Sequence, residues 1–252
     1  MVGSEAALLM LAAVISHFLT PRRNHKNMLK TTFRILTIFV VWTILTTEIC
    51  HGQVKKFDFG LEGGPSLKSL YGNSALKKNH KWGIGFSGGL FFQLNFKRNI
   101  SLRTNIVYER KGSIDPYQRT DSSGNPLGKL ITNGNYDYLT FPILIRATFG
   151  HKVKYFVNAG PYFGYLIKAG WEQKGDNFTT RKGDLTSYTK RFDSGISAGL
   201  GLTIPIKSRF YISFEIRNNL GLYNISPAVY NDNCIKTNST NLLFGLTYKL
   251  RQ

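Results

Sequence analysis

Apolar and polar residues alternate along most of the chain beyond residue 53. In the stretch "YDYLTFPILIRATF" (136–149), every second residue from Leu139 to Phe149 is apolar, and the other set mixes polar, aromatic and apolar side chains with Arg146. Successive side chains of a β-strand point to opposite faces, so this stretch predicts a strand with one apolar and one mixed face. A soluble β-sandwich would give the same alternation, so the segment alone leaves both environments open.

The same alternation recurs along the chain. We expect strands over 56–68, 83–96, 100–112, 136–149, 153–169, 190–206, 209–220 and 241–250. Very short connectors, such as 97–99 and 150–152, alternate with long polar ones (69–82, 113–135, 170–189 and 221–240). No segment after residue 53 shows sustained helical periodicity. Pro142 and Pro161 fall inside two of these segments, where we expect a bulge or a strand end because proline lacks the ladder N–H.

The mixed face distinguishes between the two environments. In a soluble barrel or sandwich it would meet water and be rich in Lys, Glu, Gln and Thr, but here it is rich in glycine, with charges of both signs among aromatic residues. That composition is typical of a crowded polar interior, as in outer-membrane barrels, which place apolar side chains outside. The pattern therefore predicts an all-β fold, an eight-stranded antiparallel transmembrane up-and-down β-barrel, over residues 53–252.

Residues 28–52 have the layout of a cleaved signal peptide. Lys30 and Arg34 form a basic region, residues 35–47 an apolar one, and Gly52 is a small residue before Gln53. The apolar run is short for a membrane-spanning helix, which needs roughly 20 residues. If translation starts at Met28, residues 1–27 are a mis-called extension; the alternative is an extra helix or a long basic region. Either way, the segment predicts export.

The formal net charge of +19 does not by itself indicate nucleic-acid binding. Basic residues are spread over predicted loops and turns, without a basic helix or a dense basic run, so we expect no nucleic-acid partner. In an outer membrane, basic loop residues would instead meet the phosphate groups of lipopolysaccharide. The candidates for this contact are Lys77, Lys78 and Lys81.

Charged residues on the mixed faces are expected to share the lumen. An eight-stranded barrel is only just wide enough for side chains to fill it, and removing one partner of a buried ion pair costs roughly 3–5 kcal/mol. We therefore expect a packed ion-pair network, with a narrow ion or proton path as the alternative. Its members are Glu62, Arg103, Glu109, Arg146, Lys168, Asp193, Glu215 and Arg217, with Phe91, Phe156 and Tyr162 projecting into the same space.

Catalytic and metal-binding patterns are weak in this sequence. Beyond the signal peptide, the two histidines His80 and His151 fall in connectors at opposite ends of the predicted barrel, so no Ser–His pair forms. Together with Cys234 they do not make a metal ligand set. We interpret "GLGLTIP" and "GPYFG" as glycines that ease a curved sheet, not as phosphate loops. We expect no enzymatic activity and no cofactor.

Six segments resemble the PorT-like outer-membrane β-barrel domain family of Bacteroidetes. They are "FDFGLEGGPSLKSLYG", "YLTFPILIRATF", "KYFVNAGPYFGYLI", "RFDSGISAGLGLTIP", "FEIRNNLGLYNI" and "NLLFGLTYKL", which follow one another in this order from residue 57 to residue 250. The resemblance implies an eight-stranded barrel in a Gram-negative outer membrane. It implies less about activity, since one member acts in type IX secretion and gliding.

The sequence therefore predicts a non-enzymatic outer-membrane barrel with a structural or secretion- or gliding-accessory role through its extracellular loops. Its expected partners are outer-membrane lipid and lipopolysaccharide, the barrel-assembly machinery during biogenesis, and a secretion-system or other envelope protein. Two alternatives remain open at this point. One is a small porin-like channel, and the other is a soluble periplasmic lipocalin-like ligand binder.

Overall fold

The computed structural model describes residues 56–73, 81–97, 99–175, 178–206, 209–227 and 234–250. The chain divides into two units, residues 1–53 and residues 54–252. The predicted extension (1–27) and signal peptide (28–52) lie outside the described residues. The fold below is that of the second unit.

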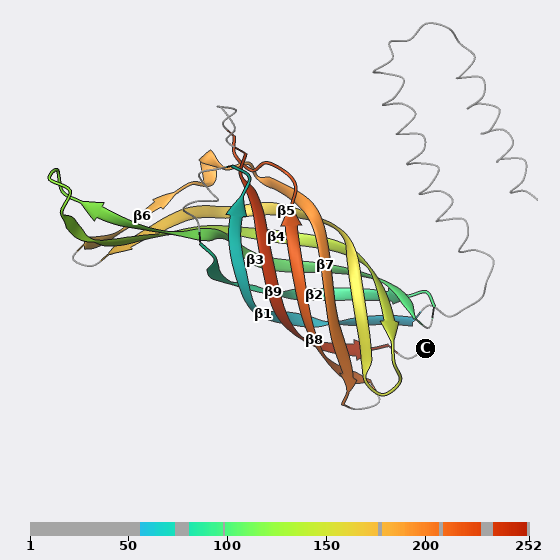
Figure 1. The fold of residues 1–252 in the computed structure, drawn as a ribbon. Helices are drawn as coiled ribbons and strands as arrows, with labels where there is room; N and C mark the ends of the chain where they lie inside the picture. The colour runs from blue at the N-terminus through green and yellow to red at the C-terminus, as the bar shows by residue number, and fades with distance from the viewer. Residues whose placement is uncertain are drawn as a thin grey trace, which may run out of the picture. The chain divides into compact units, whose positions relative to one another are not determined.

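Within the described residues, nine antiparallel strands form one continuous sheet (Figure 1). They are β1 (Lys56–Tyr71), β2 (Gly83–Asn95), β3 (Ile100–Thr120), β4 (Pro126–Phe149), β5 (Lys154–Gly175), β6 (Phe178–Asp184), β7 (Phe192–Pro205), β8 (Phe210–Gly221) and β9 (Lys236–Lys249). A short 3-10 helix, η1 (Thr186–Tyr188), follows β6. Along the described parts of the chain, no helix is long and apolar enough to cross a membrane.

Eight of these strands close into a ring. Their order is β4-β3-β2-β1-β9-β8-β7-β5, and pairing between β4 and β5 completes the circle. The remaining strand, β6, pairs with β5 beyond the ring. The predicted eight-stranded antiparallel barrel is therefore confirmed, with one additional strand.

The outer surface of the ring is apolar. Large hydrophobic side chains remain substantially exposed there, for example Ile84 at 77%, Ile145 at 65% and Leu200 at 61%. Charged and amide side chains of the alternate positions are buried inside, among them Arg103, Glu109 and Asn241. This inside-out distribution is the one predicted from the mixed faces, and it is that of a barrel surrounded by lipid.

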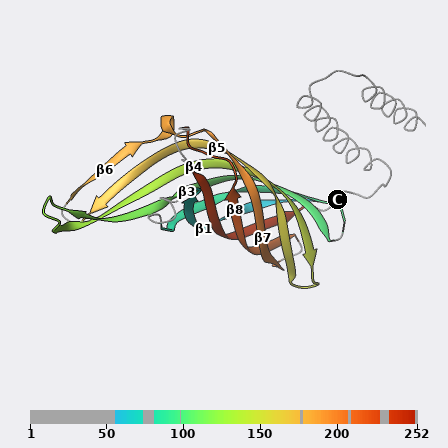
Figure 2. The same ribbon diagram turned by 45° about the horizontal axis from the view of Figure 1, so that its top comes forward.

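Two long connectors predicted as loops are largely strands. β3 continues to Thr120 and β4 begins at Pro126, so the range 113–135 forms a hairpin, and the range 170–189 contains the end of β5 and all of β6. The hairpin turn is closed by the Asp121 carboxylate, which accepts the N–H groups of Ser123 at 2.9 Å and Asn125 at 2.8 Å. We call residues 113–135 and 170–184 the extension; it projects beyond the ring in Figures 1 and 2.

The register changes at one place in the wall between β4 and β5. Asp137 pairs with Lys168, whereas the next residue, Tyr138, pairs with Leu166, so Ile167 is the extra residue of a β-bulge. The expected disturbance at Pro142 does not take this form. Pairing of β4 with β3 is interrupted beside Pro142 between Thr104↔Ile143 and Val107↔Thr140, but the register is the same on both sides.

Candidate functional site

The half of the lumen away from the extension holds an ion-pair cluster around two carboxylates. Arg217 donates to both oxygens of Glu62, at 2.7 and 3.1 Å, and through Nε to Glu215 at 2.6 Å. Arg146 donates to Glu215 at 3.0 Å, and Arg103 pairs with Glu62. All five side chains are buried. Strand alternation brings them together, because they occupy inward positions on β1, β3, β4 and β8.

Aromatic rings fill the space beside these charges. The guanidinium of Arg103 lies 3.5 Å from the ring centroid of Phe91, and that of Arg146 lies 3.7 Å from the centroid of Phe156. Both rings are buried, as predicted, and contacts of this kind stabilise a desolvated cation. Glycine makes room for them, since a Cβ atom at Gly60 would lie 2.5 Å from the Phe91 ring.

A second cluster lies nearer the extension and centres on Lys111. Its ammonium donates to Asp193 at 2.9 Å and lies 3.7 Å from Glu109. It also lies 4.2 Å from the centroid of the Tyr162 ring, and the Tyr162 hydroxyl donates to Asp193 at 3.2 Å. Glu109 in turn accepts hydrogen bonds from three neutral side chains, Asn219, Ser239 and Asn241.

The buried charges of the described residues balance. Five are basic and five are acidic: Lys68, Arg103, Lys111, Arg146 and Arg217, and Asp58, Glu62, Glu109, Asp193 and Glu215. The chain as a whole carries +19, so the buried charges contribute nothing to this excess. Eight of the ten form ion pairs, while Lys68 donates to Asn133 and Asn135 and Asp58 accepts from Asn95. The lumen formed by the described strands is therefore charge-balanced, without an excess of either charge to attract a mobile ion.

Seven of the eight predicted lumen residues belong to this buried set, and Lys168 does not. The bulge at Ile167 turns both Ile167 and Lys168 outward, and Lys168 is exposed on the outer face. The expectation for Lys168 is therefore wrong, because it assumed unbroken alternation along β5. Sequence reasoning also omitted Asp58, Lys68 and Lys111, although the first two share the alternation of Glu62 and the third that of Glu109.

Of the three lysines expected to contact lipopolysaccharide, one lies within the described residues. Lys77 and Lys78 lie outside the described residues. Lys81 is exposed, and its backbone N–H donates to the carbonyl of Ile114 at 2.7 Å, which fixes it beside the base of the extension. The contact with lipopolysaccharide stays a prediction.

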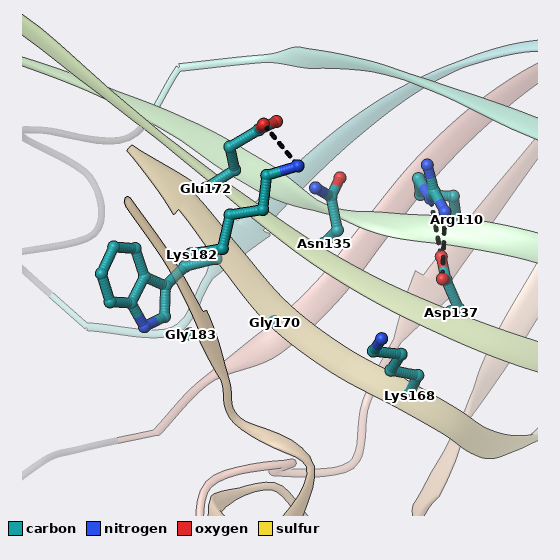
Figure 3. Close-up of a pocket in the computed structure, with 9 residues that line it drawn as sticks. Arg110, Asn135, Asp137, Lys168, Gly170, Glu172, Lys182 and Gly183 are labelled. Carbon is teal, nitrogen blue, oxygen red and sulfur yellow. Dashed lines mark hydrogen bonds and ion pairs between the residues drawn. The ribbon is translucent and has the colours of Figure 1, made fainter. Parts of the chain in front are cut away.

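A pocket of about 290 Å³ opens on the extension (Figure 3). Arg110 makes a two-pronged contact with Asp137 on one side, at 2.7 and 3.1 Å, and Lys182 pairs with Glu172 at 3.1 Å on the other. In Figure 3, Asn135 lies between these two pairs. The hydrogen bond from the Lys182 ammonium holds the pKa of the Glu172 carboxyl below its ordinary value.

Metal-binding geometry is not present in the part of the chain that the structure describes. No group of three or more His, Cys, Asp or Glu side chains there is arranged to hold a metal ion. His151 is exposed in the turn between β4 and β5, and His80 lies outside the described residues. The arrangement as a whole offers a packed lumen, an extended sheet and an external pocket.

Comparison with known proteins agrees with this architecture. A family model described as an outer membrane protein beta-barrel domain matches residues 46–226, which is more than half of the chain. No curated protein matches the sequence. A major outer membrane protein from Thermus thermophilus is similar in structure, with 11% identity and a TM-score of 0.44, over 79% of this chain and 100% of that one.

Two further solved structures show a similar degree of likeness. Outer Membrane Protein W of E. coli has 11% identity and a TM-score of 0.40, over 79% of this chain and 100% of that chain. Ail, the attachment invasion locus protein of Yersinia pestis, was solved with the heparin analogue sucrose octasulfate; it has 11% identity and a TM-score of 0.37, over 77% of this chain and 99% of that chain.

Proposed function

The chain belongs to the outer membrane protein β-barrel domain family, and we propose that it acts in the outer membrane as a non-enzymatic structural or accessory component. The proposed working part is the extension. The barrel would serve as a rigid anchor, because its interior is occupied by paired charges and aromatic rings. Long segments held on a rigid scaffold are where binding usually lies.

The observation that carries this proposal is the exposure of the hairpin formed by β3 and β4. Beyond the ring, Tyr117, Leu127 and Ile131 each expose close to half of their surface, at 48%, 46% and 46%. These side chains lie past the end of the pairing between β2 and β3, which stops at Glu109 apart from the bridge of Lys81 with Ile114. Aromatic and aliphatic side chains on a hydrogen-bonded hairpin suit contact with another envelope protein.

The finer assignment follows from the resemblance to PorT-like proteins. It favours a role in secretion or gliding, with export through the signal peptide at 28–52 and insertion by the barrel-assembly machinery. We place the extension on the extracellular side, because short turns and both ends of the barrel domain lie at the opposite end. Lys77, Lys78 and Lys81 would then face lipopolysaccharide phosphates.

Two alternatives are less well supported. A small porin-like channel needs a continuous water path, whereas the lumen contains ten buried charged side chains with Phe91 and Phe156 packed among them. A soluble lipocalin-like binder needs an apolar interior and a polar exterior, which is the reverse of the arrangement found here. Recovery of the protein in the soluble periplasm without detergent would support the second alternative and end the barrel proposal.

The extension hypothesis is tested by site-specific photo-cross-linking in native membranes. A photoreactive residue at Leu127, at the hairpin tip, should give a defined cross-linked species, and the same residue at Lys152, in a turn at the opposite end, should not give that species. A protein with a shortened hairpin should fold as a barrel but fail to complement a deletion strain. Full complementation by a folded, shortened protein would contradict the proposal.

A further inference from the structure

The pocket begins where the apolar surface of the barrel ends. Tyr108, Leu139 and Tyr165 form one row across β3, β4 and β5, and Tyr165 is 53% exposed on the outer surface. The next outward row in the direction of the extension consists of Arg110, Asp137 and Lys168. Neighbouring outward positions along a strand are about 7 Å apart, so charge replaces apolar surface within a single step.

The hollow beyond this row exists because glycine residues there have no side chain. The next outward row is Gly112, Asn135, Gly170 and Asp184, in which two of the four residues are glycine. The row after it contains Glu172 and Lys182. Two charged rows therefore stand on either side of a low floor formed by Gly170 and Asn135. The resulting volume of about 290 Å³ is just below the roughly 300–1,000 Å³ of small-molecule sites, a size that suits a single headgroup.

The lining offers more hydrogen-bond donors than acceptors. Arg110 and Lys182 are each paired with a carboxylate, but Lys168 forms no ion pair with any other described residue. Arg110 is held in place by Asp137 and by the Tyr108 hydroxyl, which accepts its third hydrogen bond at 3.2 Å. The Asn135 side chain lines the same hollow, and its amide oxygen already accepts a hydrogen bond from the Lys68 ammonium at 2.5 Å, which leaves the amide N–H groups as donors. Lys168 is thus the cation best placed to receive an anionic group.

The geometry points to a site for the phosphorylated sugar headgroup of an outer-membrane lipid. We infer that a phosphate group binds Lys168, while the sugar rests over Gly170 with its hydroxyl groups toward Asn135, Glu172 and Lys182. Its acyl chains would run down the apolar surface below Tyr108 and Tyr165. The bulge at Ile167 has a role in this arrangement, because without it the side chain of Lys168 would point into the lumen. The inference rests on the proposed placement of the extension at the outer leaflet.

The test is a titration of the folded, detergent-solubilised protein with diphosphorylated lipid A, followed by native mass spectrometry. Lys168→Gln should weaken binding about tenfold, the loss of one charge-assisted hydrogen bond. The matched control is Lys152→Gln, an exposed lysine in a turn at the opposite end, which should bind as the wild type does. Gly170→Val should also weaken binding by filling the floor, and its Cβ would meet only the Gly183 carbonyl, at 3.0 Å.

Three results would overturn the inference. They are wild-type affinity in Lys168→Gln, an equal loss in Lys152→Gln, and binding of soluble glucosamine 1-phosphate as tight as that of lipid A, which would identify a soluble ligand. Enzymatically dephosphorylated lipid A should bind the wild type as weakly as intact lipid A binds Lys168→Gln. Because these measurements do not involve the hairpin tip, a negative result here leaves the cross-linking at Leu127 to decide the proposed function separately.

Discussion

Two lysines, Lys111 and Lys168, show how far the position of a charge follows from sequence. Lys111 is two residues from Glu109, so alternation places both in the lumen, and this placement follows from the sequence alone. The same rule places Lys168 in the lumen, but it lies outside, because one extra residue at Ile167 reverses the alternation. A bulge of one residue leaves no compositional mark here, since Ile167 is as suitable for the apolar face as its neighbours.

Substituting these two lysines should affect the stability of the barrel very differently. Lys111→Met removes the cation that contacts both Asp193 and Glu109 and leaves two buried carboxylates, which should lower the free energy of unfolding by about 3–5 kcal/mol. Lys168→Met changes an exposed side chain and should alter the free energy of unfolding by less than about 0.5 kcal/mol. Heat-modifiable gel mobility and urea unfolding in detergent measure both. Equal losses for the two variants would mean that the bulge is misplaced.

A second prediction concerns the glycines of the lumen face. A Cβ atom at Gly60 would lie 2.0 Å from the Leu246 carbonyl oxygen and 2.5 Å from the Phe91 ring. Gly60→Ala should therefore destabilise the barrel by about 1–3 kcal/mol through overpacking. Gly134→Ala is the control, because the nearest atom to its Cβ is at 3.7 Å, an ordinary contact. Urea unfolding that ranks Gly134→Ala as the more damaging change would contradict this packing.

At the scale of the elements, the sequence predicts strands well within the barrel and poorly beyond it. Inside the ring, one face of each strand meets an apolar surrounding, so the alternation is visible in the sequence. In the extension, neither face of β3, β4 or β6 is buried along its length: Leu130 is buried, but Leu127 and Ile131 are exposed. Polar residues such as Gln118, Lys129 and Arg181 occur on both faces. Without a buried face there is no period of two to detect, so these strands resemble loops.

The hairpin should be separable from the barrel. Asp115 and Thr132 are paired across β3 and β4, so replacing residues 116–131 by Asn-Gly joins them through a two-residue turn that suits antiparallel strands. Because none of the ten buried charged residues lies in the removed segment, the variant should insert and show the same heat-modifiable mobility as the parent protein. Failure to insert would show that the hairpin helps to build the barrel, and its proposed role in partner contact would lose its main support.

For the whole barrel, the separation of charge is the main feature. Five buried cations and five buried anions cancel inside, and the excess positive charge of the chain lies elsewhere. The fold class can be predicted from the sequence because eight weak strand signals reinforce one another. The pocket could not be predicted in this way. It depends on three cross-strand rows whose register is fixed only when β3, β4, β5 and β6 pair.

The central claim is that the barrel anchors an external surface and does not conduct. Purified protein inserted into a planar lipid bilayer measures this directly. We expect no steady ohmic conductance after insertion, because the lumen is occupied by paired charges with Arg103 stacked on Phe91 and Arg146 on Phe156. Reproducible steps of uniform, voltage-independent conductance that scale with the number of inserted molecules would contradict the claim and favour the porin-like alternative.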